Sequence, residues 1–363
     1  MLRHIPSLHK HRGRFTVTHS TTDADIEHRK ALVLQNTEEI VTDAELDNLL
    51  DQDSPRCYVG YETSGPVHLG HWISIRKLLD LQQAGFQPIV LWADRHTQLN
   101  RKGNEAWIRD MAAYWQAVFE ALGLDADYTI GSDFQRTADY TDDLLQLSER
   151  ITINRGTRAM SDVAKDGDAA YISEIIYPLM QALDIAHLDV DLAVAGIDQR
   201  RIHMLAREHV PALGYEKPTC LHWPLLTALD GSGDKMSSSD AASMFPLHAA
   251  PGRIRDTIQN AYCPAEQVDG NPMVEIARFF VFGADQELAI TREAKYGGDV
   301  TYDTFDVLAD DFKSGEIHPA ALKPAIAETV VTRLQPVRDR ITQEPELLKP
   351  LLEEGYDRPA YLD

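Results

Sequence analysis

The chain has few cysteines and no long apolar run. Its 363 residues include three cysteines, at Cys57, Cys220 and Cys263, and they show no metal-ligand spacing. We expect them to be buried, reduced thiols of a cytosolic protein. No apolar run approaches the ~18 residues that a membrane-spanning helix needs. Together these absences argue against a disulfide scaffold, a cysteine-ligated metal site and a membrane-embedded protein.

Positive charge is also scarce. The chain has 35 Lys and Arg residues against 57 Asp and Glu residues, a formal net charge of −22, and only 11 of the basic residues are lysine. This balance argues against generic nucleic-acid binding, since a polyanionic partner would need local basic patches in an acidic field. Acidic residues spread along the chain are typical of a protein from a high-salt cytoplasm, where salt screens self-repulsion. An ordinary acidic enzyme is the alternative.

The first segment lacks acidic residues altogether. Residues 1–22 contain none, and they have no apolar core that would make them a secretory signal. We therefore expect residues 1–35 to be a disordered or spurious extension. Folding is expected to begin near Asn36, which can cap one helix, followed by a capping box of Thr42 and Glu45 for the next.

The most informative stretch that is present is Arg56–His71. Arg56–Tyr61 predicts a short strand, turn residues follow it, and helical apolar spacing begins at His71. A helix N-terminus offers free N–H groups to a phosphate. His68 and His71 can project to the same side, and Gly70 lets a flat ring approach the backbone. The stretch predicts a nucleotide site whose imidazoles donate hydrogen bonds to phosphate oxygens; a helix with two surface histidines is the alternative.

The elements that follow predict a parallel sheet. Further strands are expected at 88–94, 127–131, 190–195 and 220–226, with helices at 104–122 and 198–209 between them. Strands alternating with helices indicate right-handed crossovers and a Rossmann-like α/β fold. Residues 133–183 interrupt this rhythm with helices, including 140–153 and 171–183. From about residue 242 the pattern is helical, broken by prolines, and suits a small bundle.

A second motif, G-D-K-M-S-S-S-D at Gly233–Asp240, decides the interpretation of the first. H-L-G-H followed by K-M-S-S-S resembles the paired signatures of class I aminoacyl-tRNA synthetases. The runs Tyr177–Asp184, Gly196–Met204 and Ala261–Pro264 resemble the archaeal and eukaryotic type of tyrosyl-tRNA synthetase. The likeness covers roughly Asn36 to Ile341.

The resemblance implies a domain plan and a reaction. A Rossmann-like parallel-sheet catalytic domain is expected at 36–241, with a helical connective insertion at about 133–183. An all-α anticodon-binding domain is expected at 242–341, with a partly disordered tail at 342–363. The implied activity joins tyrosine and ATP into tyrosyl-adenylate, releases pyrophosphate, and transfers tyrosine to the 3′ end of tRNA(Tyr). The family also implies a cytoplasmic homodimer that forms through the insertion, with no membrane partner.

The tyrosine site can be assigned from the same likeness. Tyr58, on the first strand, can exchange a hydrogen bond with a substrate phenol, and Asp184 can accept the phenol proton. Such a pocket would reject phenylalanine because its polar groups would lose their partner. The likeness assigns the ammonium and carboxylate of tyrosine to four residues: Glu62, Tyr177, Gln181 and Gln199. Asp94 and His96, just beyond a strand end, are expected behind this first layer.

The chemistry needs no acid or base residue, because the tyrosine carboxylate is already a nucleophile. Catalysis is then positioning together with stabilisation of charge on the leaving pyrophosphate. The likeness assigns catalysis to His68, His71, Lys235 and Ser238. ATP binding is assigned to these and to Gly60, Gly70, Ser237 and Ser239. Mg²⁺ is expected to arrive with ATP, held by the phosphates rather than by a protein site.

Recognition of tRNA is assigned to arginines and to the C-terminal domain. Arg158 and Arg200 are expected near the first base pair of the acceptor stem. Tyr296 and His318 match positions near the anticodon, where a tyrosine can stack on an unpaired base. Ala321 departs from the pattern, because the family's best-known members carry an aspartate there. This puts hydrogen-bonded reading of the first anticodon base in doubt.

Two other classes share part of this pattern. A tryptophanyl-tRNA synthetase has the same fold, but an indole would not need Tyr58 and Asp184 around a hydroxyl. A non-catalytic tRNA-binding relative would be expected to have lost nucleotide-loop residues, and both loops are intact here. The resemblance favours a tyrosine-activating enzyme, and pyrophosphate exchange that depends on the amino acid separates all three classes.

Overall fold

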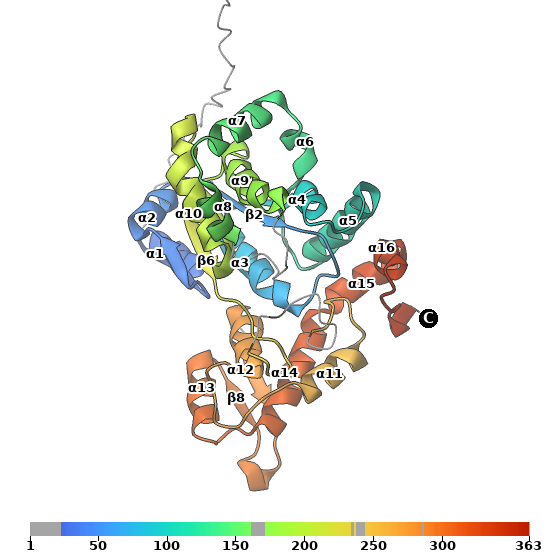
Figure 1. Cartoon of the computed structure of the whole chain (residues 1–363). Coiled ribbons are helices and arrows are strands. Elements are labelled where there is room, and N and C mark those ends of the chain that lie inside the picture. Colours follow the sequence, from blue (N-terminus) through green and yellow to red (C-terminus); the bar gives the residue numbers. More distant parts are fainter. Residues whose placement is uncertain (1–22, 161–170, 234–235, 237–243, 285–286, 363) are drawn as a thin grey trace, which may run out of the picture.

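A six-stranded sheet forms the centre of the computed structural model, which describes residues 23–160, 171–233, 236, 244–284 and 287–362 (Figure 1). The strand order is β1-β6-β5-β2-β3-β4. Strands β2 to β6 are mutually parallel, and β1 pairs antiparallel with β6 at one edge. Their bounds are β1 Glu39–Val41, β2 Arg56–Tyr61, β3 Gln87–Trp92, β4 Asp127–Ile130, β5 Leu192–Gly196 and β6 Thr219–Trp223.

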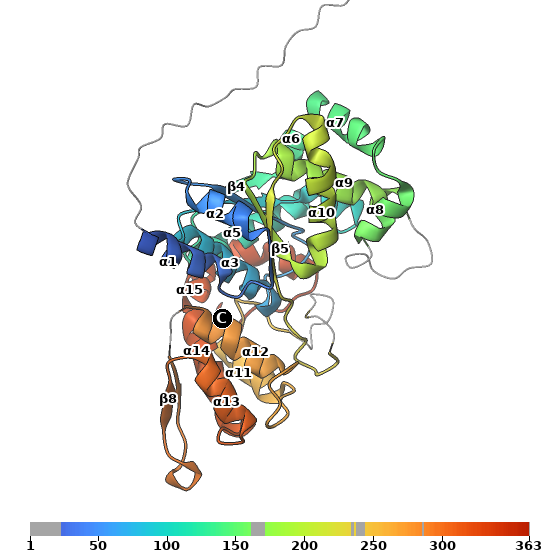
Figure 2. The same cartoon turned by 90° about the vertical axis from the view of Figure 1, so that its left-hand side faces the viewer.

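Alternate residues of these strands enter two separate cores. On β2, Cys57 and Val59 pack into one core, whereas Tyr58 packs into the other, as the two-residue period of a strand requires. The first core includes helices α1 Asp23–Leu34, α2 Asp43–Leu50, α3 Trp72–Gln83 and α5 Glu105–Ala121. The second includes α7 Ala138–Ser148, α8 Ile153–Met160, α9 Ile172–His187 and α10 Arg200–His209. Figure 2 shows α9 and α10 on one side of β5 and α3 and α5 on the other, so the predicted Rossmann-like layering is confirmed.

The helical insertion is also present. It follows β4 as α6 Gly131–Gln135, α7, α8 and α9. The helix predicted over 140–153 ends earlier than expected: it is α7, which ends at Ser148, and the next helix, α8, begins at Ile153. Residues 161–170 lie outside the described ranges.

The C-terminal region is helical, as predicted. Its helices are α11 Pro251–Asn260, α12 Pro272–Ile276, α13 Phe305–Lys313, α14 Pro319–Arg333 and α15 Gln335–Gln343. Pro251 and Pro272 begin helices, because the missing N–H of proline costs nothing at the first helical position. A short antiparallel hairpin, β7 Leu288–Ile290 with β8 Val300–Tyr302, makes the region not wholly α.

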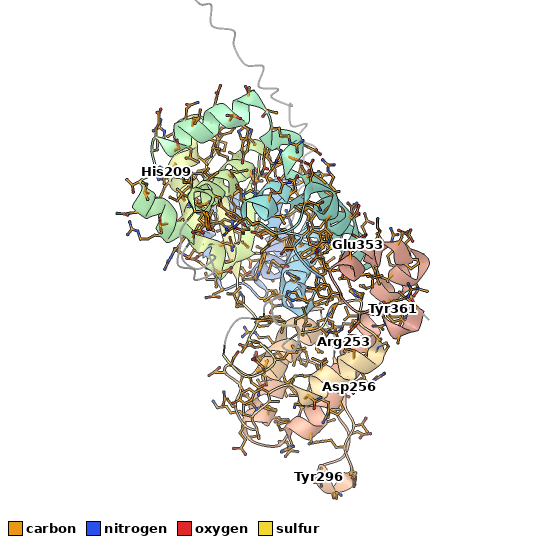
Figure 3. All side chains as sticks on the ribbon, turned by 45° about the vertical axis from the view of Figure 1, so that its right-hand side comes forward. His209, Arg253, Asp256, Tyr296, Glu353 and Tyr361 are labelled. Atoms are coloured by element: carbon orange, nitrogen blue, oxygen red, sulfur yellow. The ribbon has the colours of Figure 1, made fainter. Side chains whose placement is uncertain are left out.

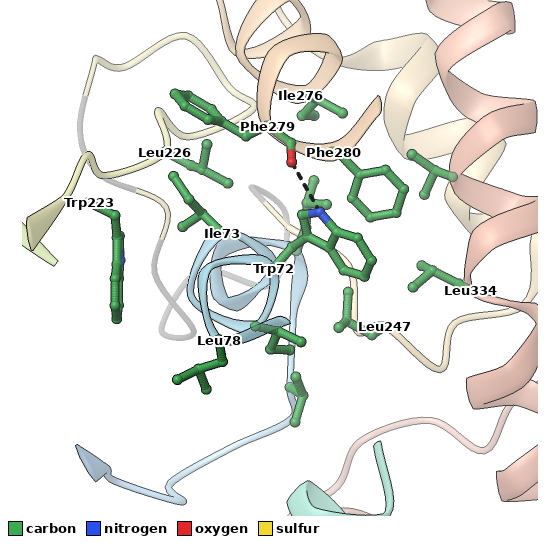
Figure 4. Close-up of a cluster of buried hydrophobic side chains, with 14 of the residues drawn as sticks. Trp72, Ile73, Leu78, Trp223, Leu226, Leu247, Ile276, Phe279, Phe280 and Leu334 are labelled. Carbon is green, nitrogen blue, oxygen red and sulfur yellow. Dashed lines mark hydrogen bonds between the residues drawn. The ribbon is translucent and has the colours of Figure 1, made fainter. Parts of the chain in front are cut away.

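One core joins this region to the catalytic sheet. The Nε1–H of Trp72, at the start of α3, donates to the carbonyl of Phe279 at 3.2 Å, and its ring lies 4.1 Å from that of Phe280 (Figure 4). Leu247 and Leu334 close the same cluster. The helix that follows H-L-G-H is therefore fixed by the C-terminal half of the chain.

Part of the predicted N-terminal extension is folded. Asp23–Leu34 is helix α1, with Leu32 and Val33 buried, so the prediction of a disordered 1–35 is wrong for this part. Buried Lys77 donates to the carbonyls of Val33 and Gln35 at the end of α1, where a helix presents unpaired acceptors. Residues 1–22 lie outside the described ranges.

Of the two helix caps predicted near the start of the fold, one is wrong and one is confirmed. Asn36 has φ +54°, a left-handed conformation typical of a helix end, so it follows α1 instead of capping the next helix. The capping box of Thr42 and Glu45 is confirmed.

The expected disorder of the tail is contradicted over its described part. In α16 Lys349–Glu353, Leu351 is buried, and Trp107 of α5 donates to the carbonyl of Pro350 at 2.9 Å. Apolar residues at Leu348 and Leu351 gave this segment a buried face despite its charge. Within the described ranges, no helix combines the length and apolarity that crossing a bilayer requires.

Candidate active site

The H-L-G-H stretch lies between β2 and α3 and fixes the orientation of two imidazoles. Nδ1 of His68 accepts from the N–H of Gly70 at 3.0 Å, and Nδ1 of His71 accepts from the N–H of His68 at 3.1 Å. A neutral imidazole that accepts through Nδ1 carries its proton on Nε2. The ring centres are 3.8 Å apart. The turn therefore holds two neighbouring Nε2–H donors.

Both imidazoles are held uncharged. Burial lowers the pKa of His68 to about 4, and burial together with neighbouring His68 keeps the pKa of His71 well below its usual value. At neutral pH the pair offers hydrogen bonds and no fixed positive charge. An anion bound here would need a cation from another segment of the chain. Lys235 is the residue predicted to provide it.

Two glycines leave space for neighbouring rings. A Cβ on Gly60 would lie 2.8 Å from the Tyr58 hydroxyl oxygen, and one on Gly70 would lie 2.8 Å from Cε1 of His68. The same Cβ on Gly70 would lie 3.3 Å from the sulfur of Met236, the one residue of the K-M-S-S-S run that is described. The N–H of Met236 donates to the carbonyl of Leu226 at 2.8 Å. The two signatures therefore meet at Gly70.

Lys235, Ser237, Ser238 and Ser239 lie outside the described residues, so their predicted roles stay predictions.

A cavity of about 510 Å³ opens at the carboxyl ends of the parallel strands. This is where open α/β sheets bind ligands, beside the point at which the strand order reverses between β2 and β5. The cavity brings together most of the residues predicted for tyrosine and ATP: Tyr58, Gly60, Glu62, Gly70, His71, Tyr177, Gln181, Asp184 and Gln199.

At one end of the cavity a carboxylate is half satisfied. Oδ1 of Asp184 accepts from Nε2 of Gln135 at 2.7 Å and from the hydroxyl of Tyr140 at 2.8 Å. Its other oxygen, Oδ2, has no hydrogen-bond partner among the described residues, and neither has the Tyr58 hydroxyl. Nε2 of His96 lies 3.8 Å from Oδ2, too far for a hydrogen bond.

Buried polar atoms without partners are costly, and a bound ligand is one way to satisfy them. Tyr58 and Asp184 are almost fully buried, at 1% and 0% exposure. Burial raises the pKa of Asp184, against the opposing influence of His96, Gln135 and Tyr140. Burial and the nearby Asp184 raise the pKa of Tyr58. This end of the cavity therefore suits a neutral ligand group that both donates and accepts, such as a hydroxyl.

Sequence analysis missed the two residues that hold Asp184. Gln135 ends α6 and Tyr140 lies in the first turns of α7, inside the insertion, and nothing in their local pattern distinguished them from core or surface residues. Asp94 was expected behind the site, and it does not line the cavity: its Oδ1 accepts from the N–H of Ser132 at 2.9 Å. His96 does line it.

The middle of the cavity carries the other predicted polar groups. The Tyr177 hydroxyl donates to Oε1 of Glu62 at 2.8 Å, and Nε2 of Gln181 donates to Oε1 of Gln199 at 3.3 Å. Glu62 also pairs with Nζ of Lys102 at 2.9 Å, a cation that the sequence did not single out. Burial and the charge of Glu62 raise the pKa of Tyr177. The carboxylate of Glu62 is therefore already paired with the ammonium group of Lys102.

The predicted tRNA residues lie outside the cavity. Arg200 forms a two-pronged contact with Glu39, at 2.6 and 2.8 Å. Arg158 is exposed on α8, and the guanidinium of Arg201 reaches its carbonyl at 3.4 Å, so α8 and α10 present these arginines together.

The predicted anticodon residues lie in the C-terminal region. Tyr296 is 63% exposed at the tip of the β7–β8 hairpin, at the far end of the molecule from the sheet (Figure 3). His318 is exposed at the start of α14, where its Nδ1 accepts from the N–H of Ala320 at 3.2 Å. These positions are consistent with contact to a long ligand and leave the roles as predictions.

Known proteins with similar sequences and structures point to the same family. The family described as tRNA synthetases class I (W and Y) matches residues 50–335. The tyrosine–tRNA ligase of Archaeoglobus fulgidus is 47% identical over 321 residues, covering 87% of this chain and 98% of that protein. The crystal structure of tyrosyl-tRNA synthetase from the same organism, complexed with L-tyrosine, has a TM-score of 0.84 and covers 87% of this chain and 99% of that one.

A second tyrosyl-tRNA synthetase structure, from Aeropyrum pernix, is 34% identical with a TM-score of 0.83, covering 92% of this chain and 100% of that one. The tryptophanyl-tRNA synthetase of Aeropyrum pernix shares the fold at 18% identity and a TM-score of 0.67, covering 85% of this chain and 84% of that one. The similarity is therefore much greater to the tyrosine enzymes.

Proposed function

The chain belongs to the class I tRNA synthetases of the tryptophan and tyrosine group, and within it to the tyrosine–tRNA ligases; on that basis we propose how its own residues carry the reaction. The enzyme activates L-tyrosine with ATP to tyrosyl-adenylate, releases pyrophosphate, and transfers tyrosine to tRNA(Tyr). The observation that best supports tyrosine as the substrate is a pair of buried atoms, Tyr58 Oη and Asp184 Oδ2, that have no hydrogen-bond partner in the described part of the chain. A phenol hydroxyl donates to the carboxylate oxygen and exchanges a second hydrogen bond with Tyr58.

The remaining polar groups orient the amino-acid end of the substrate. Tyr177, Gln181 and Gln199 lie along the cavity from the phenol site and offer hydroxyl and amide groups to the ammonium and carboxylate of tyrosine. Glu62 adds negative charge near the ammonium, and Lys102 keeps that carboxylate oriented. This arrangement holds the tyrosine carboxylate as the nucleophile for the α-phosphate, so positioning supplies much of the rate.

The phosphate end stabilises charge that develops during the reaction. The Nε2–H groups of His68 and His71 donate to phosphate oxygens, and Gly60 and Gly70 line the same cavity, where they contribute to the nucleotide site. Lys235 adds the positive charge that the neutral imidazoles lack, and Ser237, Ser238 and Ser239 add hydroxyl donors. Mg²⁺ enters bound to the ATP phosphates. Among the described residues no cluster of three or more His, Cys, Asp or Glu side chains is arranged to hold a metal.

For tRNA, Arg158 and Arg200 contact the acceptor end, while Tyr296 and His318 contact the anticodon. Support comes from the exposure of Arg158, Tyr296 and His318, and from the position of Tyr296 at the far end of the molecule from the sheet (Figure 3). Arg200 is half-buried and pairs with Glu39. Ala321 offers no side-chain hydrogen bond, so the first anticodon base must be read by stacking or by other groups. The matching domain plan is a catalytic domain over residues 36–241, extended by α1, and an anticodon-binding domain over 242–341.

We also infer a homodimer formed through the insertion. Four large apolar side chains of the insertion are exposed: Leu145, Ile153, Tyr171 and Ile172, at 61%, 70%, 48% and 78%. Support for this proposal is that all four side chains belong to the insertion, since association surfaces are typically rich in exposed apolar groups. The enzyme works in the cytoplasm, where its tRNA is used.

Pyrophosphate exchange dependent on the amino acid tests the assignment. The purified chain should exchange labelled pyrophosphate into ATP with L-tyrosine, and far more weakly with L-phenylalanine or L-tryptophan. Exchange that prefers tryptophan would reassign the substrate, and a chain that binds tRNA without exchange would be a non-catalytic relative.

A further inference from the structure

A chain of hydrogen bonds connects the surface near Arg200 to the wall of the cavity. Arg200 pairs with Glu39 on β1, and Oε2 of Glu39 lies 3.0 Å from Nδ1 of His222 on β6. Nε2 of His222 lies 3.1 Å from Nδ1 of His203 on α10. Both imidazoles are completely buried, with 0% exposure. None of the reaction roles above uses His203, His222 or Glu39.

The chain fixes where the protons lie. The contact with Arg200 keeps the pKa of Glu39 below its usual value, so its carboxylate accepts and Nδ1 of His222 donates. Nε2 of His222 is then the acceptor for the Nδ1–H of His203, since burial holds the pKa of both imidazoles low and keeps them neutral. Nε2 of His203 is left with a lone pair. That atom has no hydrogen-bond partner among the described residues.

His203 belongs to the cavity wall that the tyrosine and the phosphates leave free. It lines the cavity together with Gly196 and Trp223, at the carboxyl ends of β5 and β6. The phenol site lies at Tyr58 on β2, and the phosphate donors precede α3. His203 lies in α10, four residues beyond Gln199, which immediately precedes that helix, so the two are about one helical turn apart. The part of ATP that remains for this wall is the adenosine.

We propose that Nε2 of His203 accepts a hydrogen bond from a donor on the adenosine of bound ATP, either a ribose hydroxyl or the 6-amino group. His222 and Glu39 are positioning residues that hold the ring in the accepting tautomer. The proposal rests on ATP binding in this cavity as described above. It adds a nucleotide contact that neither signature motif contains.

Nucleotide analogues test the contact. In tyrosine-dependent pyrophosphate exchange, His203→Phe should lower kcat/KM for ATP by about tenfold, the upper effect of one neutral hydrogen bond, and leave the KM for tyrosine unchanged. The same comparison is made with 2′-deoxy-ATP, 3′-deoxy-ATP and purine riboside triphosphate, which lacks the 6-amino group. With the analogue that lacks the contacted donor, wild type and His203→Phe should have the same kcat/KM. That analogue therefore identifies which group of the adenosine donates to His203.

Two matched variants separate contact from packing. His203→Gln places an amide where Nε2 lies and should restore most of the ATP efficiency, whereas His203→Asn places one where Nδ1 lies and should not. An equal loss in both, or the same loss with ATP and every analogue, would show that His203 only packs and would overturn the proposal. Failure of the wild-type enzyme to exchange with tyrosine would instead overturn the proposed function.

A measurement on the unaltered protein covers variants that fail to fold. In ¹⁵N NMR of histidine-labelled protein, Nε2 of His203 should be unprotonated, and its resonance should shift when a non-hydrolysable ATP analogue binds. A protonated Nε2, or one that does not respond to the analogue, contradicts the proposal.

Discussion

The two ends of the cavity are built on opposite plans. At the phenol end, Asp184 and Tyr58 are buried, and each presents a polar atom that no described residue bonds, so the groups that would meet a ligand are already in place. At the phosphate end, Nδ1 of His68 accepts from Gly70 N–H and Nδ1 of His71 accepts from His68 N–H; His71 lines the cavity and His68 does not. The proposed cation, Lys235, comes from another segment. The phenol end selects the substrate as it binds, whereas the phosphate end offers hydrogen-bond donors to the negative charge that develops in the transition state. Changes at the phosphate end should therefore lower kcat, and changes at the phenol end should alter KM and selectivity.

The largest effect is expected at the phosphate end. His71→Ala removes a preorganised Nε2–H donor, so kcat for adenylate formation should fall by about 100- to 1000-fold, as for other donors to developing charge, with little change in tyrosine affinity. Lys235→Ala should behave in the same way. Single-turnover kinetics and equilibrium tyrosine binding measure the two quantities. His71→Gln, which keeps a donor near the Nε2 position, is the matched control; tyrosine binding that collapses while kcat holds would reverse the roles of the two ends.

The phenol end should show the opposite signature. Asp184→Ala removes a hydrogen bond to a charged group, about 1.5–3 kcal/mol, so KM for tyrosine should rise by about 10- to 150-fold. Steady-state exchange kinetics with tyrosine and phenylalanine measure it. Asp184→Asn keeps the side-chain volume and an acceptor for Gln135 or Tyr140. A rise in KM for tyrosine in this variant therefore measures the contribution of the negative charge alone. Unchanged tyrosine kinetics in both variants would remove Asp184 from the site.

Acid should destabilise the phosphate end and not the phenol end. His68 has a folded pKa of about 4, below its usual 6.5, so the unfolded chain binds its proton first as the pH falls, and stability is lost from about pH 6.5 downward. Asp184 has a raised pKa and contributes with the opposite sign. His68→Asn keeps an acceptor near Nδ1 but removes the titrating group. The free energy of unfolding should then fall less steeply with acid in the variant, by about 1.4 kcal/mol per pH unit between pH 6.5 and 4. Urea unfolding at pH 7 and pH 5 measures the slope; equal slopes in wild type and variant contradict the burial argument.

The smallest expected effect is that of salt, which should act on tRNA at the outer surface more than on the small substrates in the cavity. The net charge of −22 repels tRNA over distances that salt shortens, from a Debye length of about 10 Å at 0.1 M to about 3 Å at 1 M. Aminoacylation should rise by about two- to fivefold between 0.1 and 1 M KCl on this screening argument, and the thermal midpoint should rise with it. Pyrophosphate exchange, which uses only the cavity, should change less. Aminoacylation and thermal midpoint that both fall monotonically with salt would mean the composition carries no high-salt adaptation.

The sequence predicted the parts of the molecule whose signals are local. Strand periodicity and the turn chemistry after Tyr61 located β2 and the start of α3, and motif likeness located Tyr58 and Asp184, which the fold brings to one cavity. The two residues are far apart in the chain, and only the fold shows that the Tyr58 hydroxyl and Oδ2 of Asp184 have no hydrogen-bond partner among the described residues. That absence, and not the motif, gives the physical reason for a hydroxyl-bearing substrate.

The features that escaped prediction depend on long-range contacts. Gln135 and Tyr140 hold Asp184 from other helices, and the His203–His222–Glu39 chain joins α10, β6 and β1. Helix α1 was missed because its stability depends on tertiary partners: Lys77 and Arg29 bond to carbonyls in other segments. Helices of this length gain most of their stability from such packing, which periodicity does not reveal.

The central claim, that Tyr58 Oη and Asp184 Oδ2 receive the substrate hydroxyl, is tested most directly by selectivity in Tyr58→Phe. This change removes one oxygen and keeps the ring in its packed position. The measurement is the ratio of kcat/KM for tyrosine to that for phenylalanine in pyrophosphate exchange, in wild type and variant. The account predicts a lower ratio, by about two- to tenfold for one neutral hydrogen bond, with phenylalanine unchanged or better. An unchanged ratio would contradict it.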